Sequence, residues 1–136
     1  MTYAKPLPSI DRWNKPFWDA ARQGELQLQT CEDCGHWWFP PAPVCPSCLS
    51  TRVTWKRASG RGKIWSRCRF HHIYDKAFAD EAPYNVCMIE LEEGPLFISN
   101  VVGAAWEDIG IGDAVEACFE KATEEVTLVR FKLAEK

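Results

Sequence analysis

The sequence predicts a mainly β fold with a short helical arm, and three observations support that prediction. Two CxxC pairs lie close together in the first half of the chain, a short amphipathic pattern precedes them, and five short apolar segments separated by turn residues follow them. Such evenly spaced short strands are typical of small barrels and sandwiches. With 46% hydrophobic and 26% charged residues over 136 positions, the composition is that of a globular protein.

The helical arm is expected at residues 1–24. Pro16 stands where a helix can start, Phe17 and Ala20 mark one apolar face, and Gly24 supplies the stop. We therefore expect one short amphipathic helix that ends just before the first strand.

The four clustered cysteines are Cys31, Cys34, Cys45 and Cys48. The two-residue gap lets both thiolates of a pair reach a common point about 2.3 Å away, so the spacing predicts a tetrahedral Zn²⁺ site. Two disulfides or four unrelated thiols are the alternative. The N-terminus is polar and proline-broken, without an apolar signal segment, which indicates a cytoplasmic chain with reduced thiols. Four sulfur ligands leave no open coordination position, so this zinc is expected to be structural.

The segments that flank the cysteines read as strands. Leu26 and Leu28 alternate in ELQLQT, and RVTWKRA follows the second CxxC pair. Strand, knuckle, knuckle and strand in this order are typical of a zinc ribbon. So small a unit has little apolar surface to bury, whereas a structural zinc contributes on the order of 10 kcal/mol. We expect a metal-dependent ribbon over residues 25–56.

Residues 57–136 are expected to form a barrel. Its five predicted strands lie in the segments 62–74, 83–94, 95–103, 113–120 and 126–133. Five strands over so short a stretch fit a Greek-key barrel of the OB type, and a five-stranded open sandwich is the alternative. In the first segment strict alternation places Ile64, Ser66 and Cys68 on the inner face, and Trp65 and Arg67 on the outer face.

Charge is distributed unevenly along the chain. Residues 57–74 carry five Lys/Arg and no Asp/Glu, whereas residues 75–136 carry five Lys/Arg against fourteen Asp/Glu, and the net charge is −3. An anionic ligand is therefore expected at the short basic stretch. The alternative is that these cations solvate the outer face of a strand and pair with nearby carboxylates, which contributes only about 0–1 kcal/mol per pair.

Six aromatic side chains gather in and before the ribbon. They are Trp13, Phe17 and Trp18 on the arm, and Trp37, Trp38 and Phe39 between the CxxC pairs. A ribbon has little interior in which to hide large rings, and exposed aromatic surface usually marks an interface. These six residues are thus a candidate partner interface. In the competing interpretation, the arm folds back over the ribbon and the two sets of rings bury each other.

Several motifs in register also resemble a known family. They are FWDAARQGELQLQTCEDCGHWWFPPAPVCPSC, SGRGKIWS, APYNVCMIELEEGPLFISNVVG and IGDAVEACFE. Together, from about Phe17 to Phe131, they resemble the DUF35 family of small proteins with a helical arm, a rubredoxin-like zinc ribbon and an OB-fold. The resemblance implies that the four cysteines are the zinc ligands.

The resemblance also implies a function. DUF35 proteins are non-catalytic companions of thiolase-superfamily enzymes, among them acyl-CoA thiolases, hydroxymethylglutaryl-CoA synthase assemblies and thiolase-like aldolases that shorten steroid side chains. In some, the domain is fused to a MaoC-like hydratase. The expected function is therefore an accessory subunit, in a two-plus-two assembly, that supports acyl-CoA binding or channelling in steroid, fatty or aromatic acyl-CoA metabolism.

The basic stretch would then bind the coenzyme A phosphates, because guanidinium groups bind phosphate oxygens bidentately and an indole ring can lie against adenine. The candidate residues are Arg57, Arg61, Lys63, Trp65 and Arg67.

A single-stranded nucleic-acid-binding module is the alternative function, because zinc ribbons and OB barrels both bind single strands. The net acidity argues against it. No catalytic residue is predicted, and no segment approaches the roughly 18 consecutive apolar residues of a membrane span.

Overall fold

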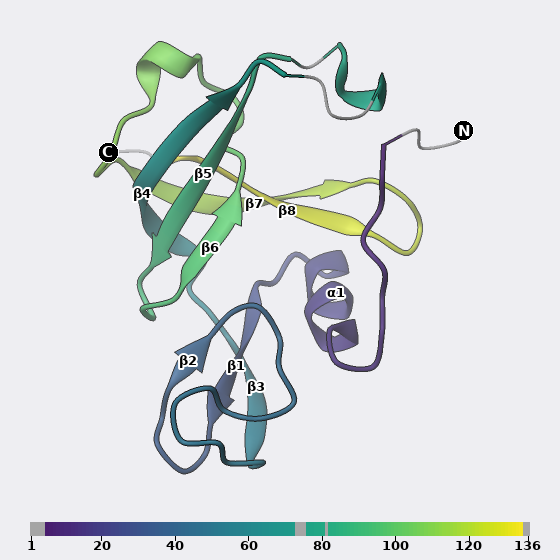
Figure 1. Cartoon of the computed structure of the whole chain (residues 1–136), viewed down its shortest axis with the longest axis vertical. Coiled ribbons are helices and arrows are strands. Elements are labelled where there is room, and N and C mark those ends of the chain that lie inside the picture. Colours follow the sequence, from purple (N-terminus) through teal and green to yellow (C-terminus); the bar gives the residue numbers. More distant parts are fainter. Residues whose placement is uncertain (1–4, 73–75, 81, 135–136) are drawn as a thin grey trace.

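The computed structural model describes residues 5–72, 76–80 and 82–134. One helix, a small three-stranded sheet and a larger five-stranded sheet follow one another along the chain, with the small sheet below the large one in Figure 1. The last residues of the strand predicted over 62–74 lie outside the described residues. The mainly β fold class is confirmed.

The helix α1 spans Lys15–Arg22 and carries Pro16 in its first turn, as the sequence predicts. It ends before Gly24, whose φ of 77° lies in the left-handed region that glycine adopts without strain. Phe17 and Ala21 are buried, and the helix packs against strands of both sheets. Only one face of so short a helix is apolar, so its stability depends on this packing.

The ribbon sheet has the strand order β2-β1-β3. Both outer strands run antiparallel to the central one, and the strands are β1 (Gln27–Cys31), β2 (Trp37–Trp38) and β3 (Val53–Arg57). The two long strands match the predicted flanks of the cysteine loops. β2 was not predicted, because two residues are too short for an alternation pattern to register.

The larger sheet has the order β6-β5-β4-β7-β8, with every neighbouring pair antiparallel. Its strands are β4 (Arg61–Phe70), β5 (Tyr84–Leu91), β6 (Leu96–Ser99), β7 (Ala114–Lys121) and β8 (Thr127–Leu133), and two short 3₁₀ turns, η1 (Lys76–Phe78) and η2 (Trp106–Asp108), lie in the connections. Each of the five predicted segments covers one strand, except that β4 begins one residue before its segment and β7 ends one residue after its segment.

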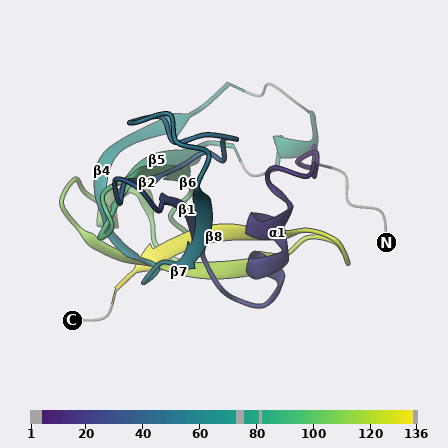
Figure 2. The same ribbon diagram turned by 90° about the horizontal axis from the view of Figure 1, so that it is seen from below.

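This sheet curls, so the open sandwich is not what forms; Figure 2 shows the curvature from below. A parallel bridge joins Val101, just after β6, to Phe131 in β8. The N–H of Phe131 donates to the carbonyl of Asn100 at 3.0 Å, and the N–H of Val102 donates to the carbonyl of Phe131 at 2.8 Å. The seam links the two edges of the sheet, as expected for an OB-type half-barrel.

A bulge at Trp65 overturns part of the predicted alternation. Ile64 stands opposite Ile89, Ser66 stands opposite Met88, and the pairing register shifts between them. One extra residue in a strand moves every later side chain to the other face. Beyond the bulge Arg67 stands opposite the buried Cys87, on the inner side of the sheet.

The prediction that Arg67 faces outward was therefore wrong. The prediction that Ser66 and Cys68 face inward was also wrong. The Arg67 guanidinium donates to the carbonyls of Trp106 at 3.0 Å and Ile109 at 2.7 Å, and lies 4.1 Å from the centre of the Trp106 ring. Hydrogen bonds and a cation–π contact thus hold η2 against β4.

A chain of aromatic rings joins the helix, the ribbon and the barrel. Phe17 of α1 lies 4.9 Å from Trp18 and 5.5 Å from Phe39, measured between ring centres. Phe39, in the loop between the CxxC pairs, lies 4.4 Å from Phe97 of β6, which in turn lies 5.8 Å from Phe131. We call these five residues the aromatic joint. They belong to one continuous core that spans both sheets and the helix.

Candidate metal centre and neighbouring surfaces

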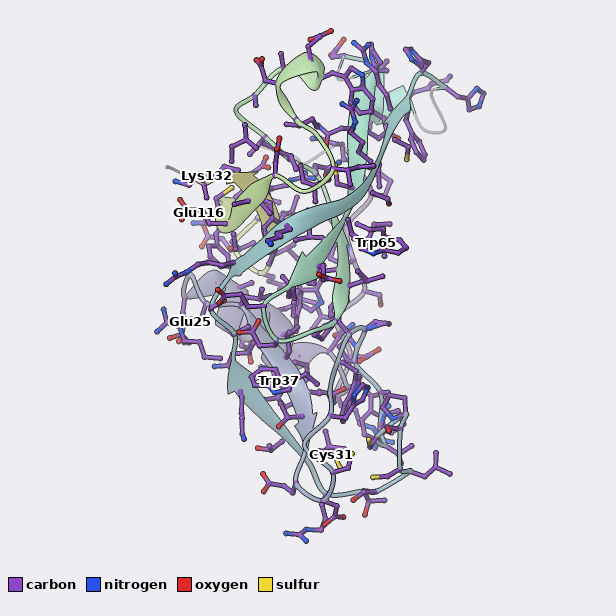
Figure 3. All side chains as sticks on the ribbon, turned by 90° about the vertical axis from the view of Figure 1, so that its left-hand side faces the viewer. Glu25, Cys31, Trp37, Trp65, Glu116 and Lys132 are labelled. Carbon is purple, nitrogen blue, oxygen red and sulfur yellow. The ribbon has the colours of Figure 1, made fainter. Side chains whose placement is uncertain are left out.

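The four predicted cysteines converge at the end of the ribbon. All four Sγ atoms lie within 4.8 Å of one another, with 3.5 Å between Cys31 and Cys48 and 3.6 Å between Cys34 and Cys45. Sulfurs at about 2.3 Å from one ion in a tetrahedron stand about 3.8 Å apart. The thiol cluster therefore has the size and ligand set of a tetrahedral metal site, and Figure 3 shows Cys31 at the end of the molecule far from Glu116 and Lys132.

The two cysteine loops are built alike. The Sγ of Cys31 accepts backbone N–H groups of Asp33 at 3.3 Å and Cys34 at 3.4 Å, and the Sγ of Cys45 accepts those of Ser47 at 3.4 Å and Cys48 at 3.5 Å. Backbone donors aimed at sulfur favour the thiolate, which is the form that binds metal. Each loop is thus preorganised as a metal-binding knuckle.

The thiols do not share one ionisation state. The backbone N–H of Cys34, helped by that of Asp33, lowers the pKa of Cys31 to about 6, although burial opposes this shift. The N–H of Ser50 also favours the Cys48 thiolate, but the neighbouring Cys31 sulfur together with burial raises the pKa of Cys48 to about 12. Four thiolates this close repel one another, so full ionisation requires a cation among them.

Polar contacts fasten the second knuckle to the first. The Asp33 carboxylate accepts the guanidinium of Arg52 at 2.7 Å and the hydroxyl of Ser50. Gly35 follows the first CxxC with a φ of 77°, and Leu49 follows the second with a φ of 65°. An exposed leucine in this left-handed conformation is strained by about 1–2 kcal/mol. The backbone of both knuckles therefore has the same shape despite different residues.

The basic stretch does not form one face. Arg57, Arg61 and Lys63 are exposed, and Arg57 lies 3.5 Å from the carboxylate of Glu25. Arg57 and Arg61 both border a small polar cavity of about 310 Å³ where the ribbon meets the barrel. Trp65 is 54% exposed on the outer face of the sheet, and Arg67 faces inward. The structure thus groups Arg57 and Arg61 at this cavity, leaves Lys63 exposed two residues farther along β4, and turns Arg67 to the other face.

The six aromatic candidates mostly pack inside the molecule. Phe17 and Trp38 are buried, and the Trp38 indole N–H donates to the side-chain carbonyl of Gln29 at 2.8 Å. Three others are half-buried and pack against the main core, and they are Trp18, Trp37 and Phe39. Trp13 is exposed at 43%. Phe17 and Phe39 meet as in the competing interpretation, whereas Trp38 packs in a separate cluster with Cys31 and Cys45.

Sequence reasoning missed an apolar strip on the outer face of β4, β5 and β6. Ile98 stands opposite Met88, which stands opposite Ser66 at the bulge beside Trp65. Ile98 is 58% exposed and Trp65 is 54% exposed, with the half-buried Met88 between them. We call Trp65, Met88 and Ile98 the outer strip. The outer strip can be recognised only from the pairing register of neighbouring strands, and that register is known only once the bulge is located.

Two cysteines outside the cluster are poor nucleophiles. Burial raises the pKa of the Cys87 thiol, and it also raises the pKa of the Cys118 thiol. A thiol with a raised pKa is mostly protonated near neutral pH and reacts slowly. Among the described residues, the grouping that could hold a metal ion is the four-cysteine cluster. No helix in the described part of the chain is long and apolar enough to cross a membrane.

A four-thiol knuckle pair on a three-stranded ribbon, followed by a curled five-stranded sheet, defines the class of zinc-ribbon and OB-fold proteins. Residues 18–54 match the family model described as "ChsH2, rubredoxin-like zinc ribbon domain", and residues 55–120 match "ChsH2, C-terminal OB-fold domain". A "DUF35 domain-containing scaffold protein" of Methanocaldococcus jannaschii is 36% identical over 96 residues, which are 70% of this chain and 67% of that protein. The chain belongs to the DUF35 family.

One further relative and two solved structures extend the comparison. A "probable enoyl-CoA hydratase alpha subunit" of Thermomonospora curvata is 38% identical over 96% of this chain, and this chain spans 40% of that protein's length. A solved structure named "Ltp2-ChsH2(DUF35) aldolase" contains a chain that is 37% identical, with a TM-score of 0.83, over 93% of this chain and 98% of that chain. A Sulfolobus solfataricus DUF35 structure of unknown function, at 12% identity and a TM-score of 0.61, shares the fold.

Proposed function

We propose that this chain is a non-catalytic accessory subunit that docks on a thiolase-superfamily enzyme and supports its use of an acyl-CoA substrate. The observation that carries the proposal is the 37% identity along almost the whole length of both chains with the DUF35 chain of an aldolase assembly. The scaffold names of the archaeal relatives and the hydratase name of the bacterial relative point in the same direction.

The proposed metal is Zn²⁺, held by Cys31, Cys34, Cys45 and Cys48. The donor set supports this assignment, because four thiolates at tetrahedral spacing suit zinc. When bound, such an ion supplies folding free energy and no reaction chemistry, since its coordination positions are filled. The ribbon residues hold the ion, and the barrel offers the surfaces for partner and substrate.

We place the docking surface on the outer strip. Trp65 and Ile98 are more than half exposed and are neighbours across Met88, so they form a continuous apolar surface rather than scattered residues. Continuous apolar surface of this kind usually marks an interface, and tryptophan is enriched among the residues that dominate binding. Trp13 remains a predicted contact because it too is exposed.

Removing one side chain from the outer strip tests the docking. Ile98→Ala and Trp65→Ala are each expected to weaken binding to a thiolase-superfamily enzyme that co-purifies with the native chain by about tenfold or more, measured by calorimetry or co-elution. The matched control is Leu49→Ala in the second knuckle, because Leu49 is 72% exposed but lies on the ribbon. Wild-type affinity in both strip variants, or no affinity of the wild-type chain for any thiolase-superfamily protein, contradicts the proposal.

The coenzyme A phosphates are proposed to contact Arg57 and Arg61 at the small polar cavity. Arg61→Gln is expected to raise the KM for acyl-CoA of the assembled enzyme several-fold without changing assembly, because one phosphate-binding guanidinium is lost. Arg22→Gln, on the exposed side of the helix, is the control. An unchanged KM in Arg61→Gln would assign Arg61 to ordinary surface solvation.

A further inference from the structure

A cavity beside the barrel seam lies away from both the cysteine cluster and the small polar cavity. Its volume is about 690 Å³, which lies within the usual range of about 300–1,000 Å³ for small-molecule sites. It lies beside the seam of the barrel, between the start of β5, the end of β6 and strand β8, and Arg69 of β4 borders it. Among the residues of the proposed docking and coenzyme A surfaces, Ile98 of the outer strip also borders this space.

One wall of the cavity is apolar. Val86, Ile98, Val101 and Leu128 contribute aliphatic side chains to it, and the Trp106 ring borders the same space. An aliphatic or ring-shaped group of a ligand would displace water from these surfaces, and each buried methylene contributes about 0.8 kcal/mol.

The polar part of the cavity lining is a preorganised network of hydrogen bonds. The Arg130 guanidinium donates to the carboxylate of Glu120 at 3.1 Å and to the side-chain oxygen of Asn100. The side-chain amide of Asn100 in turn donates to the backbone carbonyl of Asn85. The side-chain amide of Asn85 donates to the backbone carbonyl of Val101 at 2.8 Å. This network fixes Arg130, which is 19% exposed, so its remaining N–H groups have a defined direction.

The charge of the cavity is positive. Its charged side chains are Lys5, Arg69, Glu120 and Arg130, and Glu120 is already paired with Arg130. Among the described residues no ion pair engages Arg69, whose guanidinium lies 5.8 Å from the Trp106 ring centre. A guanidinium without a carboxylate at the mouth of an apolar cavity is suited to bind an anionic group.

From this combination we infer that the seam cavity binds a small amphiphilic organic anion, namely a carboxylate with an aliphatic or ring-shaped body. The anionic group lies at Arg69 and the fixed guanidinium of Arg130, and the body lies against Val86, Ile98 and Leu128. The bound molecule would touch β5, β6 and β8 at once, so it would also stabilise the seam between the sheet edges. The site needs no partner enzyme, and it shares Ile98 with the outer strip.

The test uses the whole, metal-loaded chain and sodium decanoate as the probe, below its micellar concentration. Decanoate is expected to shift the amide NMR signals of Asn85, of residues 99–102 and of Arg130, and to raise the melting temperature. Acetate, which lacks the apolar body, and decyltrimethylammonium, which has the opposite charge, are each expected to bind at least tenfold more weakly. Equal binding of decanoate and decyltrimethylammonium, or shifts spread over the whole surface, would overturn the inference.

Two variants locate the site. Arg69→Gln is expected to weaken decanoate binding about tenfold or more. The matched control Lys132→Gln is expected to leave decanoate binding unchanged, because Lys132 lies on β8 outside the cavity and pairs with Glu116 at 3.5 Å. Ile98→Asp is expected to weaken binding similarly by placing a carboxylate on the apolar wall. Wild-type affinity in both Arg69→Gln and Ile98→Asp would show that decanoate binds elsewhere. Since Arg69 is not part of the outer strip, Arg69→Gln also separates this site from partner docking.

Discussion

Replacing Cys31 by serine is expected to abolish stable metal binding and to unfold the ribbon at room temperature. Cys31 is buried at the end of β1, and backbone N–H donors lower the pKa of its thiol to about 6. Structural zinc contributes about 10–16 kcal/mol in small zinc domains, which is comparable to the whole stability of a typical domain, about 5–15 kcal/mol. Metal content per chain after purification and near-ultraviolet circular dichroism measure the two effects.

Cys68→Ser is the matched control for this experiment. Cys68 is exposed on the outer face of β4 and belongs to no metal-binding group among the described residues, so its replacement is expected to leave metal content at one ion per chain. Chelation of the wild-type protein is expected to reproduce the Cys31→Ser state. A Cys31→Ser chain that keeps its ribbon signals without bound metal would show that the ribbon folds on apolar packing alone.

Phe97→Ala is expected to destabilise the protein by about 3–5 kcal/mol, the usual cost of removing a buried phenylalanine ring. Phe97 is 4% exposed and contacts Phe39, Phe17 and Phe131, with its ring centre 4.4 Å from that of Phe39. The cavity left behind would separate the rings of the helix, the ribbon and the barrel that meet in the aromatic joint. Denaturant titration measures the change in the free energy of unfolding.

The next residue along the strand is the matched control. Ile98→Ala lies on the outward side of β6, where Ile98 is 58% exposed, so its effect on the free energy of unfolding is expected to stay below about 1 kcal/mol. Similar losses in Phe97→Ala and Ile98→Ala would mean that the rings of the aromatic joint contribute little beyond ordinary strand packing.

The sequence predicted those features that local patterns determine. The two CxxC pairs fix which loops meet, because a two-residue gap has few conformations that place both sulfurs inward. The apolar segments between glycine and proline residues located all five barrel strands, and Pro16 with Gly24 bounded the helix. In each case the residues that determine the structure are near neighbours in the chain.

Features that depend on tertiary contacts could not be predicted in this way. Six aromatic rings near a small ribbon are compatible with an exposed interface, and only the packing of α1 against the loop that carries Phe39 shows that most of them are covered. The direction of Arg67 depends on the bulge at Trp65, which neither residue type nor alternation reveals. The cavity beside the seam joins residues that are more than 30 positions apart, such as Arg69 and Arg130.

The bulge also makes Trp65 a residue that the pairing of β4 with β5 does not require. Trp65 is exposed, so many substitutions there would leave the fold intact. Deleting Trp65 would make the pairing past Ile64 regular, with Ser66 still opposite Met88 and Arg67 still opposite Cys87, so the guanidinium that fastens η2 would keep its direction. The residue at the bulge therefore serves the outer strip rather than the barrel, and its loss is expected to weaken partner docking while the fold is kept.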